Sequence, residues 1–443
     1  MCSVIAAAAG APALAQTADA GHARGFYLLG GTASFGYSSL GPMQLAGNMR
    51  GAGLRPDYFA SSSLSVGYTS SGAGGALSLN YTPTYLNQFR YSESGGFNQT
   101  LSFGVFRRVS SKTSASFGLS GSDSSVAQFA FSTGTLSRLA AAPGTAEALA
   151  SAIIGRQQTD VELASVLSTP GTTDAAAQAA LYGTRVLSAG TTASVSYSRS
   201  PRLTMFVSGS ANRSQPLSSR TAQTGGALAL RSTTAEARTG LSYGSSGRTT
   251  LGLSGGYRRS QSQYAESDVT DLTASVGRQL SRRWFAEVSG GAARVENRRA
   301  SLFLTAAGMA PMMTFSGGGN LGFRARTHTL LARYSYGAGD TYGMGAGRSQ
   351  STEGAWSFGR PGQSWTLTVS GARQQMTGAV QDLRMWRAEA TLRKTLSPHL
   401  AVAFSSSWIE NSARGASVFP MVSGYYARVN LIFSRGGSGT RRR

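Results

Sequence analysis

The sequence predicts an all-β protein, a transmembrane antiparallel up-and-down β-barrel of about 18 strands, with 16 strands as the alternative. Three observations predict this fold. Apolar and polar residues alternate in segments that recur along almost the whole chain. The connections between these segments alternate between short and long. The charged residues are sorted between the two kinds of connection, with only basic residues at the short ones.

In each alternating segment one face is apolar and the other is small and polar. Ser78 and Asn80, for example, lie between Leu77, Leu79 and Tyr81. Successive side chains of a strand point to opposite faces, so this period of two predicts strands. The pattern recurs at Leu101, Phe103 and Val105; Phe117 and Leu119; Val195 and Tyr197; Met205 and Val207; Leu251 and Leu253; Leu272 and Val276; Leu321 and Phe323; Trp356 and Phe358; Trp365 and Val369; Trp386 and Leu392; and Phe404 and Trp408.

The connections form the second observation. Short connections are expected at residues 110–111, 200–201, 245–247, 279–283, 325–326, 360–362 and 396–398. Long connections are expected near residues 38–59, 86–96, 123–190, 213–233, 259–268, 296–313, 338–350, 375–384 and 410–421. Short turns at one end and long loops at the other are typical of bacterial membrane barrels, whose short turns are periplasmic. The weak pattern of residues 296–327 leaves the count of 16 strands open.

The charges form the third observation. The chain carries 41 Lys and Arg against 19 Asp and Glu, a formal net charge of +22. A basic collar on one rim suits contact with the anionic headgroups of the inner leaflet, which predicts that the net charge mostly serves orientation and anchoring. The basic residues at or beside the short connections or in the tail are Arg107, Arg108, Lys112, Arg199, Arg202, Arg248, Arg278, Arg282, Arg283, Arg324, Arg326, Arg360, Arg393, Lys394, Arg435, Arg441, Arg442 and Arg443.

The composition agrees with a membrane barrel. The 443 residues include 57 Gly and only 14% charged residues. No run of about 18 apolar residues exists, so no transmembrane helix is predicted. The mean hydropathy of -0.13 agrees with membrane strands, because each apolar residue is averaged with a polar neighbour. The single cysteine, Cys2, lies in the N-terminal apolar segment, so a mature chain without it would contain no disulfide.

The two ends of the chain differ from the barrel. Residues 1–15 are apolar, end in Ala13-Leu14-Ala15 and are expected to be the remnant of a signal peptide cleaved before Gln16. The basic start of such a peptide is missing, so a disordered Ala-rich end is the alternative. We expect a periplasmic segment at residues 16–25, the barrel at 26–433 and a basic tail at 434–443.

An insert at residues 123–190 interrupts the strand pattern. Residues 145–154 are Ala-rich, Thr159-Asp160-Val161-Glu162 predicts a capping box, and residues 174–187 contain three consecutive alanines. These features predict a short helical insert between the fifth and sixth strands. A stretch of this length without strands is usually functional.

The last strand, expected at residues 422–433, carries the resemblance to a known class. Its apolar face reads Tyr425, Ala427, Val429, Leu431 and Phe433, and it lies close to the C-terminus. This pattern resembles the closing strand of Gram-negative outer-membrane β-barrels, which the barrel assembly machinery reads. The resemblance implies localisation in the cell outer membrane. The even number of strands also requires this strand to run toward the periplasm and to pair with the first one, near residues 27–35.

The polar face of the strands predicts the lining of a pore. Arginine rings favour anion passage. The alternative is that the charges form cross-strand ion pairs that hold the wall together. The candidate pore-lining residues are Glu236, Arg238, Arg258, Glu287, Arg333, Arg387, Glu389 and Arg428.

Motifs for catalysis or metal binding are absent from the sequence. His22, His328 and His399 are isolated, and no spacing of Cys and His suggests a metal site. An enzyme would need His328 or His399 within hydrogen-bonding distance of a Ser or Asp. The arginines are spread over many turns, which argues against nucleic acid as a partner. We therefore expect no enzyme, no cofactor and no metal.

Two classes of function remain open. The first is a porin-like passive channel for small solutes with an anion preference, in which the insert either folds inward, as the loop at this position does in general porins, or caps the outside. The second is a structural or adhesin-like surface barrel, or the outer-membrane component of an exopolysaccharide or secretion apparatus. The expected partners are outer-membrane lipids, the barrel assembly machinery and small solutes, and a homo-oligomer is left open.

Overall fold

A computed structural model gives the fold. It describes residues 24–39, 56–72, 74–90, 96–125, 185–216, 231–246, 248–262, 265–299, 310–340, 346–359, 364–377, 381–397, 399–415 and 422–434. The predicted signal peptide and most of the predicted helical insert lie outside these residues. Residues 185–187, expected to end a helix, instead begin a strand. This strand, β6 Arg185–Ser198, starts earlier than we expected, because the alternation of outward and inward positions already begins at Arg185.

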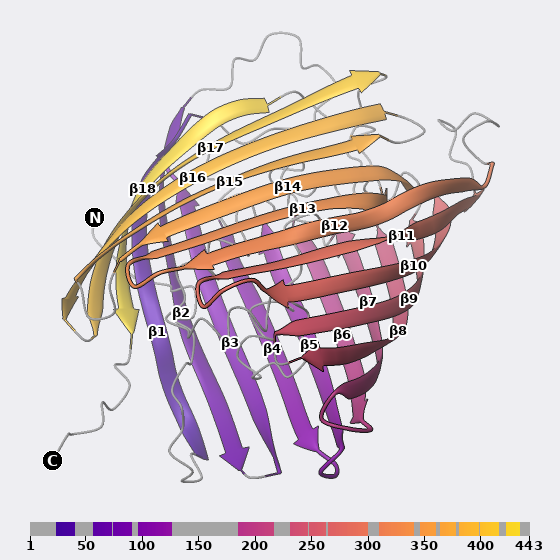
Figure 1. Ribbon diagram of the computed structural model, residues 1–443. Helices are drawn as coiled ribbons and strands as arrows, with labels where there is room; N and C mark the ends of the chain where they lie inside the picture. The colour runs from indigo at the N-terminus through magenta and orange to yellow at the C-terminus, as the bar shows by residue number, and fades with distance from the viewer. Residues whose placement is uncertain are drawn as a thin grey trace, which may run out of the picture.

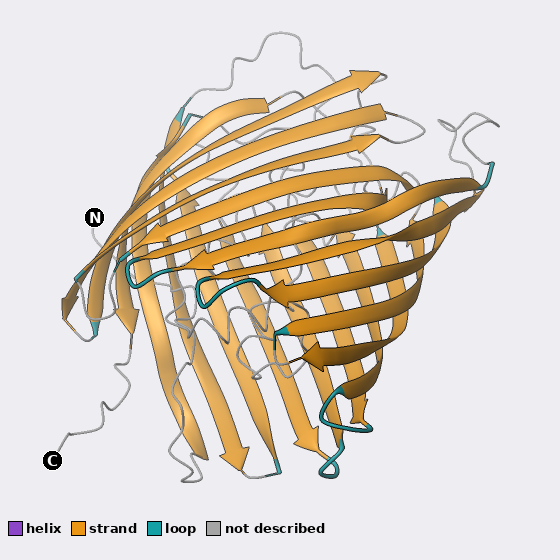
Figure 2. Cartoon of the chain, in the orientation of Figure 1, coloured by secondary structure: helices purple, strands orange, loops and turns teal. Residues whose placement is uncertain are grey.

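The described residues form 18 strands and no helix (Figure 2). The strands are β1 Arg24–Ser38, β2 Asp57–Gly72, β3 Gly75–Gln88, β4 Gly96–Arg108, β5 Thr113–Ser125, β6 Arg185–Ser198, β7 Leu203–Pro216, β8 Ser232–Ser246, β9 Thr249–Ser262, β10 Glu266–Gln279, β11 Trp284–Arg299, β12 Met312–Arg324, β13 His328–Asp340, β14 Ala346–Phe358, β15 Trp365–Thr377, β16 Gln381–Ser397, β17 Leu400–Gly415 and β18 Val422–Ser434. Because β12 occupies the weakly patterned region, the alternative of 16 strands is wrong.

The strands close into one antiparallel barrel. Each strand pairs with the strands before and after it in the chain, and β1 pairs with β18 from Gly30 with Ser434 to Ser38 with Tyr426. Closure leaves no sheet edge, which a membrane requires because lipid cannot satisfy backbone N–H and C=O groups. Figure 1 shows the two walls of the barrel, with β1–β7 crossing steeply behind β9–β18. The predicted pairing of the first and last strands is confirmed.

The apolar face of the strands points outward. In β18, Tyr425, Val429 and Phe433 are about half exposed, whereas Tyr426 on the other face is buried. Val288 in β11, Leu272 in β10 and Phe315 in β12 are 66%, 59% and 58% exposed, and a contiguous exposed apolar surface of this kind is expected where side chains face lipid. The alternation in the sequence therefore separates a lipid-facing surface from an inward, polar surface.

Aromatic side chains mark both edges of the apolar band. At the long-connection end Tyr37 packs on Tyr58 and Tyr425, with ring centroids 5.3 and 5.6 Å away. At the short-turn end Trp284 lies 4.7 Å from Phe323, and the Lys394 ammonium lies 4.8 Å from the Trp365 ring. Two aromatic belts around an apolar band are typical of membrane barrels. The protein is thus an outer-membrane β-barrel. Among the described residues no helix is long and apolar enough to span a membrane.

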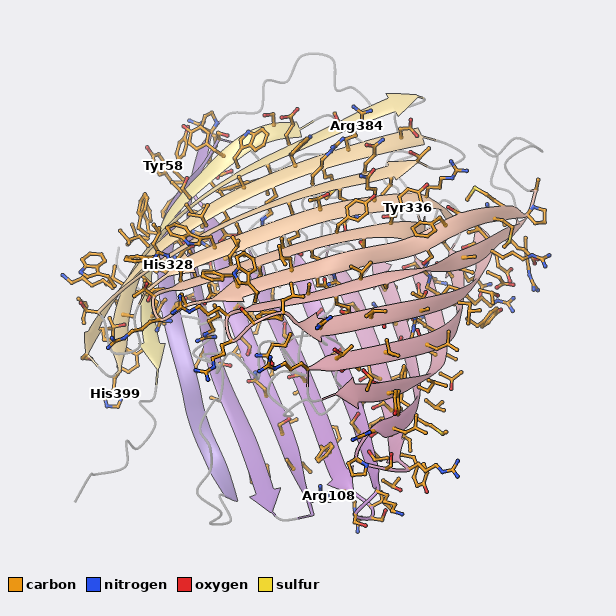
Figure 3. All side chains as sticks on the ribbon, viewed as in Figure 1. Tyr58, Arg108, His328, Tyr336, Arg384 and His399 are labelled. Carbon is orange, nitrogen blue, oxygen red and sulfur yellow. The ribbon has the colours of Figure 1, made fainter. Side chains whose placement is uncertain are left out.

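The two rims of the barrel differ. In Figure 3, Arg108 at the bottom and His328 and His399 at the left lie on the short-turn rim, here called the lower rim, and Tyr58, Tyr336 and Arg384 lie on the opposite, upper rim. The strand order places the basic residues of the short connections on the lower rim, where β1 begins and β18 ends. By the rule for bacterial barrels this rim is periplasmic. Its contact with the inner leaflet stays a prediction.

The predicted connections need two corrections. An eighth short turn, at residues 73–74 between β2 and β3, was missed. Four connections expected to be long are short, at residues 263–265, 341–345, 378–380 and 416–421. The strands continue pairing above the lipid band, where their outward residues become polar and the apolar alternation that we used to find strands stops. The contrast between the two rims is therefore weaker than predicted.

Candidate functional site: the inward face of the barrel

The inward face has two unlike walls. The inward positions of β1–β7 carry mainly hydroxyl groups, whereas those of β8–β18 carry most of the charges. Strand register places all eight candidates on the face opposite the apolar one: Glu236, Arg238, Arg258, Glu287, Arg333, Arg387, Glu389 and Arg428. Their role in lining a pore stays a prediction.

Pairs of serines add side-chain hydrogen bonds between neighbouring strands of the hydroxyl wall. Hydroxyl groups add polarity without charge and need little space, so this wall is polar and lined by small side chains. Among the described inward side chains of β1–β7, Asp57 and Arg108 alone are charged, and they lie at opposite ends of the barrel. The hydroxyl pairs with O–O distances of 2.6–2.7 Å are Ser114–Ser196, Ser116–Ser194, Ser122–Ser188 and Ser214–Ser232.

On the charged wall Arg238 joins three strands. Its Nη2 donates to both carboxylate oxygens of Asp271 at 3.1 Å, and its Nε lies 3.4 Å from Glu236 Oε1. Its Nη1 also donates to Ser254 at 3.4 Å. This guanidinium thus has two carboxylates around it, which keeps it in place and offsets its charge. Asp271 was missed, although its place opposite the apolar residues of β10 would have revealed it.

A second group of charges surrounds Glu389. Its carboxylate is 5% exposed and accepts a hydrogen bond from Arg387 at 2.8 Å, while Arg428 lies 3.9 Å away. Next to it, Thr391 donates to the Ser405 hydroxyl at 3.1 Å, and the Asn430 amide donates to the same hydroxyl at 3.4 Å. One carboxylate therefore balances two arginines on adjacent parts of the wall.

The two groups are linked by charges on β11–β14. Asn320 donates to Glu287 at 2.9 Å, and Arg333 is paired in register with Asn320 and Glu353. A recess of about 20 Å³, the size of one water molecule, lies beside Glu353 and Arg387, with Ser370, Gly371 and Ala372 around it. Glu353 was also missed, although its place opposite the apolar residues Trp356 and Phe358 of β14 would have revealed it.

Near the long-connection end, β13 of the charged wall contacts the inner side of β9, β10 and β11. Arg258 Nη2 in β9 donates to the carbonyl oxygen of Ala338 in β13 at 3.1 Å. Ala338 also packs against a buried apolar cluster on the inward side of β10 and β11, made of Val269, Ala293 and Val295. The end of β13 therefore lies against the inner side of strands that are not its neighbours in the sheet. Arg258 is thus occupied by a structural contact.

Large inward rings lie flat on the wall. The Phe285 ring covers Gly322, its partner in β12, so closely that a Cβ on Gly322 would lie 1.9 Å from a ring atom. Phe206 covers Gly240 in the same way, at 2.7 Å. Glycine at these two positions is required because any side chain would push the ring inward. The arrangement keeps bulky apolar groups out of the centre of the barrel.

The two described histidines, His328 and His399, lie at the short-turn rim. His328 is on the outward side, with its ring centroid 5.0 Å from Phe358 and 6.0 Å from Trp356, and so belongs to the lower aromatic belt. His399 lies in the turn between β16 and β17, where its backbone N–H donates to Ser397. His22 lies outside the described residues. Within the described strands and turns, no group of three or more His, Cys, Asp and Glu could hold a metal ion.

Comparisons with known proteins add solved structures only. No protein-family model matches the chain, and no curated protein matches it. Pseudomonas aeruginosa OccK2 (OpdF) is 13% identical, with 92% of this chain and 97% of that chain covered and a TM-score of 0.42. OpdK from the same organism, solved with vanillate, is 12% identical, with coverage of 91% and 96% and a TM-score of 0.40. The siderophore receptor PirA from Acinetobacter baumannii is 8% identical, with coverage of 91% and 80% and a TM-score of 0.41. At these TM-scores the fold assignment rests on the strand pairing described above.

Proposed function

We propose that the barrel is a passive channel through which small hydrophilic solutes cross the outer membrane. The observation that carries this proposal is the polar inward face, in which a hydroxyl wall on β1–β7 faces a charged wall on β8–β18. Barrels of roughly 16–18 strands are wide enough to leave an aqueous passage. A solute in such a passage would exchange its water for hydroxyl groups on one side and for paired charges on the other.

The ion preference of this channel should be weak. Carboxylates lie next to Arg238, Arg387 and Arg428. These ion pairs support the alternative that much of the charged wall is structural, and they offset the positive charge that would attract anions. The described inward side chains still include more arginines than carboxylates. The arginines are Arg108, Arg238, Arg258, Arg324, Arg333, Arg387, Arg393 and Arg428, and the acids are Asp57, Glu236, Asp271, Glu287, Glu353 and Glu389. We infer a mild preference for anions.

Reversal potentials in a salt gradient test this proposal. The refolded chain in a planar bilayer should show a reversal potential shifted toward the chloride equilibrium. Replacing Arg238, Arg258 and Arg333 by Ser should move the reversal potential toward the cation equilibrium. The reason is that the carboxylates of Glu236 and Asp271 lose Arg238 as their partner, so their negative charges are no longer offset and attract cations. Arg213→Ser, on the outward face of β7, is the matched control and should change nothing. An unchanged reversal potential in the triple variant would refute the assignment of the pore lining.

A non-conducting surface barrel is the second candidate. The inward position of the β13 end, held by Arg258 and the cluster of Val269, Ala293 and Val295, favours it because it narrows the barrel near one rim. Swelling of liposomes that contain the protein, in isotonic solutions of a neutral sugar, separates the two candidates. Swelling at a rate set by the size of the sugar supports the channel, and its absence supports the surface barrel.

A further inference from the structure

Six charged residues form a cluster on the outward face of the barrel, at the end of β9–β11 away from the short turns. We name it the outer arginine cluster; its members are Arg259, Glu266, Asp268, Arg294, Glu296 and Arg298. In register Asp268 lies between Arg259 of β9 and Glu296 of β11, so the cluster spans three adjacent strands. It shares its face with the lipid-facing Leu272 and Val276 of β10.

The ion pairs of the cluster arrange its charges in two layers. Arg298 Nε lies 2.5 Å from Asp268 Oδ2, Arg259 pairs with Glu266, and Arg294 pairs with Glu296. The three arginine side chains are 47%, 58% and 54% exposed for Arg259, Arg294 and Arg298. Their carboxylate partners Glu266, Glu296 and Asp268 are 17%, 33% and 6% exposed. The guanidinium groups thus lie above the acids and face outward.

This layering gives a cationic surface to a cluster with no formal net charge. A guanidinium has five N–H donors, and a carboxylate that approaches from one side leaves the others free for a further acceptor. The acids also hold the side chains in place: Asp268 accepts a hydrogen bond from Tyr257 at 3.0 Å in addition to its pairing with Arg298. Side chains that are already ordered lose less entropy when they bind a ligand.

The position of the cluster relative to the apolar band identifies what it faces. Asp268 is four residues from Leu272 along β10, or about 13 Å at the usual rise of a strand. Tyr257, at the edge of the band, and Phe315, which is 58% exposed on β12, lie next to the cluster on the side of the lipid. The long-connection rim is the extracellular rim, so the guanidinium groups lie at the level of the outer-leaflet headgroups.

We propose that the outer arginine cluster binds the phosphate groups of a phosphorylated lipid of the outer leaflet. Arginine forks match phosphate oxygens with two parallel hydrogen bonds, which a lysine cannot provide. The apolar surface directly below, with Leu272 and Phe315, would contact the acyl chains of the same lipid molecule. Contact with both parts of one molecule favours a lipid over a free anion. The site is independent of whether the barrel conducts.

Native mass spectrometry of the full refolded chain in detergent tests the proposal. The probes are diphosphorylated lipid A, the same lipid with its phosphates removed, and inorganic phosphate. The wild type should retain the diphosphorylated lipid, and occupancy should fall about tenfold with the dephosphorylated lipid or when Arg259, Arg294 and Arg298 are all replaced by Ser. The corresponding Lys variant keeps the charge and should recover only part of the binding. Arg278→Ser, on the outward face of the same sheet at the other rim, should bind like the wild type.

Three results would overturn the proposal. They are equal occupancy in the triple Ser variant and the wild type, equal occupancy with and without the lipid phosphates, and saturation of the site by inorganic phosphate at the same concentration as by the lipid. If the triple variant does not refold, Arg294→Gln serves in its place, because Arg294 is the most exposed of the three and its loss disturbs the wall least. Its occupancy should still fall several-fold, and unchanged occupancy would count against the site.

Discussion

At the scale of the residue, Glu389 gives the sharpest test of the charged wall. Glu389→Gln removes the charge that balances Arg387 and Arg428, so these two arginines would repel each other. We expect a loss of about 1–3 kcal/mol in the free energy of unfolding, measured by urea titration in lipid vesicles, together with a stronger anion preference. Glu410→Gln removes the same charge on the outward face of β17 and is the control. If both variants behave alike, Glu389 does not balance the two arginines.

Gly322 tests whether the inward rings lie flat on the wall. The three atoms nearest to a Cβ at this position all belong to the Phe285 ring, so Gly322→Ala should turn the ring inward. Overpacking of this kind costs about 1–3 kcal/mol of stability, and the displaced ring should also lower the channel conductance. The double variant with Phe285→Ala should recover the conductance. Gly290→Ala, whose Cβ would lie 3.6 Å from Phe315 on the outward face, is the control and should change neither property.

At the scale of the element, the end of β13 depends on a contact outside the sheet. Pairing with β12 stops at Tyr336, so residues 337–340 pair with β14 and pack on the Arg258 side of the barrel. Arg258→Ala should therefore speed hydrogen exchange of the amides of residues 337–338, measured by mass spectrometry. Exchange at residues 329–333 of the same strand is the internal control. Equal protection of residues 337–338 in both proteins would show that the contact does not hold this end.

The strands themselves could be predicted from the sequence, but their lengths could not. Alternation with apolar residues locates a strand where it faces lipid, as in Tyr425 to Phe433. Above the lipid band the outward residues become polar, as Arg259 and Asp268 show, and the signal stops although the pairing continues. The inward parity of Arg238 could likewise be predicted, whereas its pairing with Asp271 depends on a register that no local pattern specifies. The contact of Arg258 with Ala338 joins β9 and β13, which are not neighbours in the sheet, and has no signal in the sequence.

At the scale of the whole molecule, closure is the condition for folding. Deleting residues 422–434 removes β18 and leaves β17 and β1 with unpaired edges that lipid cannot satisfy. We expect this chain not to reach the compact, heat-modifiable form on a cold gel. A chain shortened by residues 435–443 alone is the control and should fold. A compact form of the first chain would mean that the barrel can close without β18.

The central claim is that the two walls enclose a passage for solutes. Single-channel recording of the refolded full chain in a planar bilayer tests it most directly. The account predicts stable conductance steps that grow in proportion to salt concentration and become smaller in Gly322→Ala. The absence of conductance steps from a chain shown to be folded and inserted would contradict it.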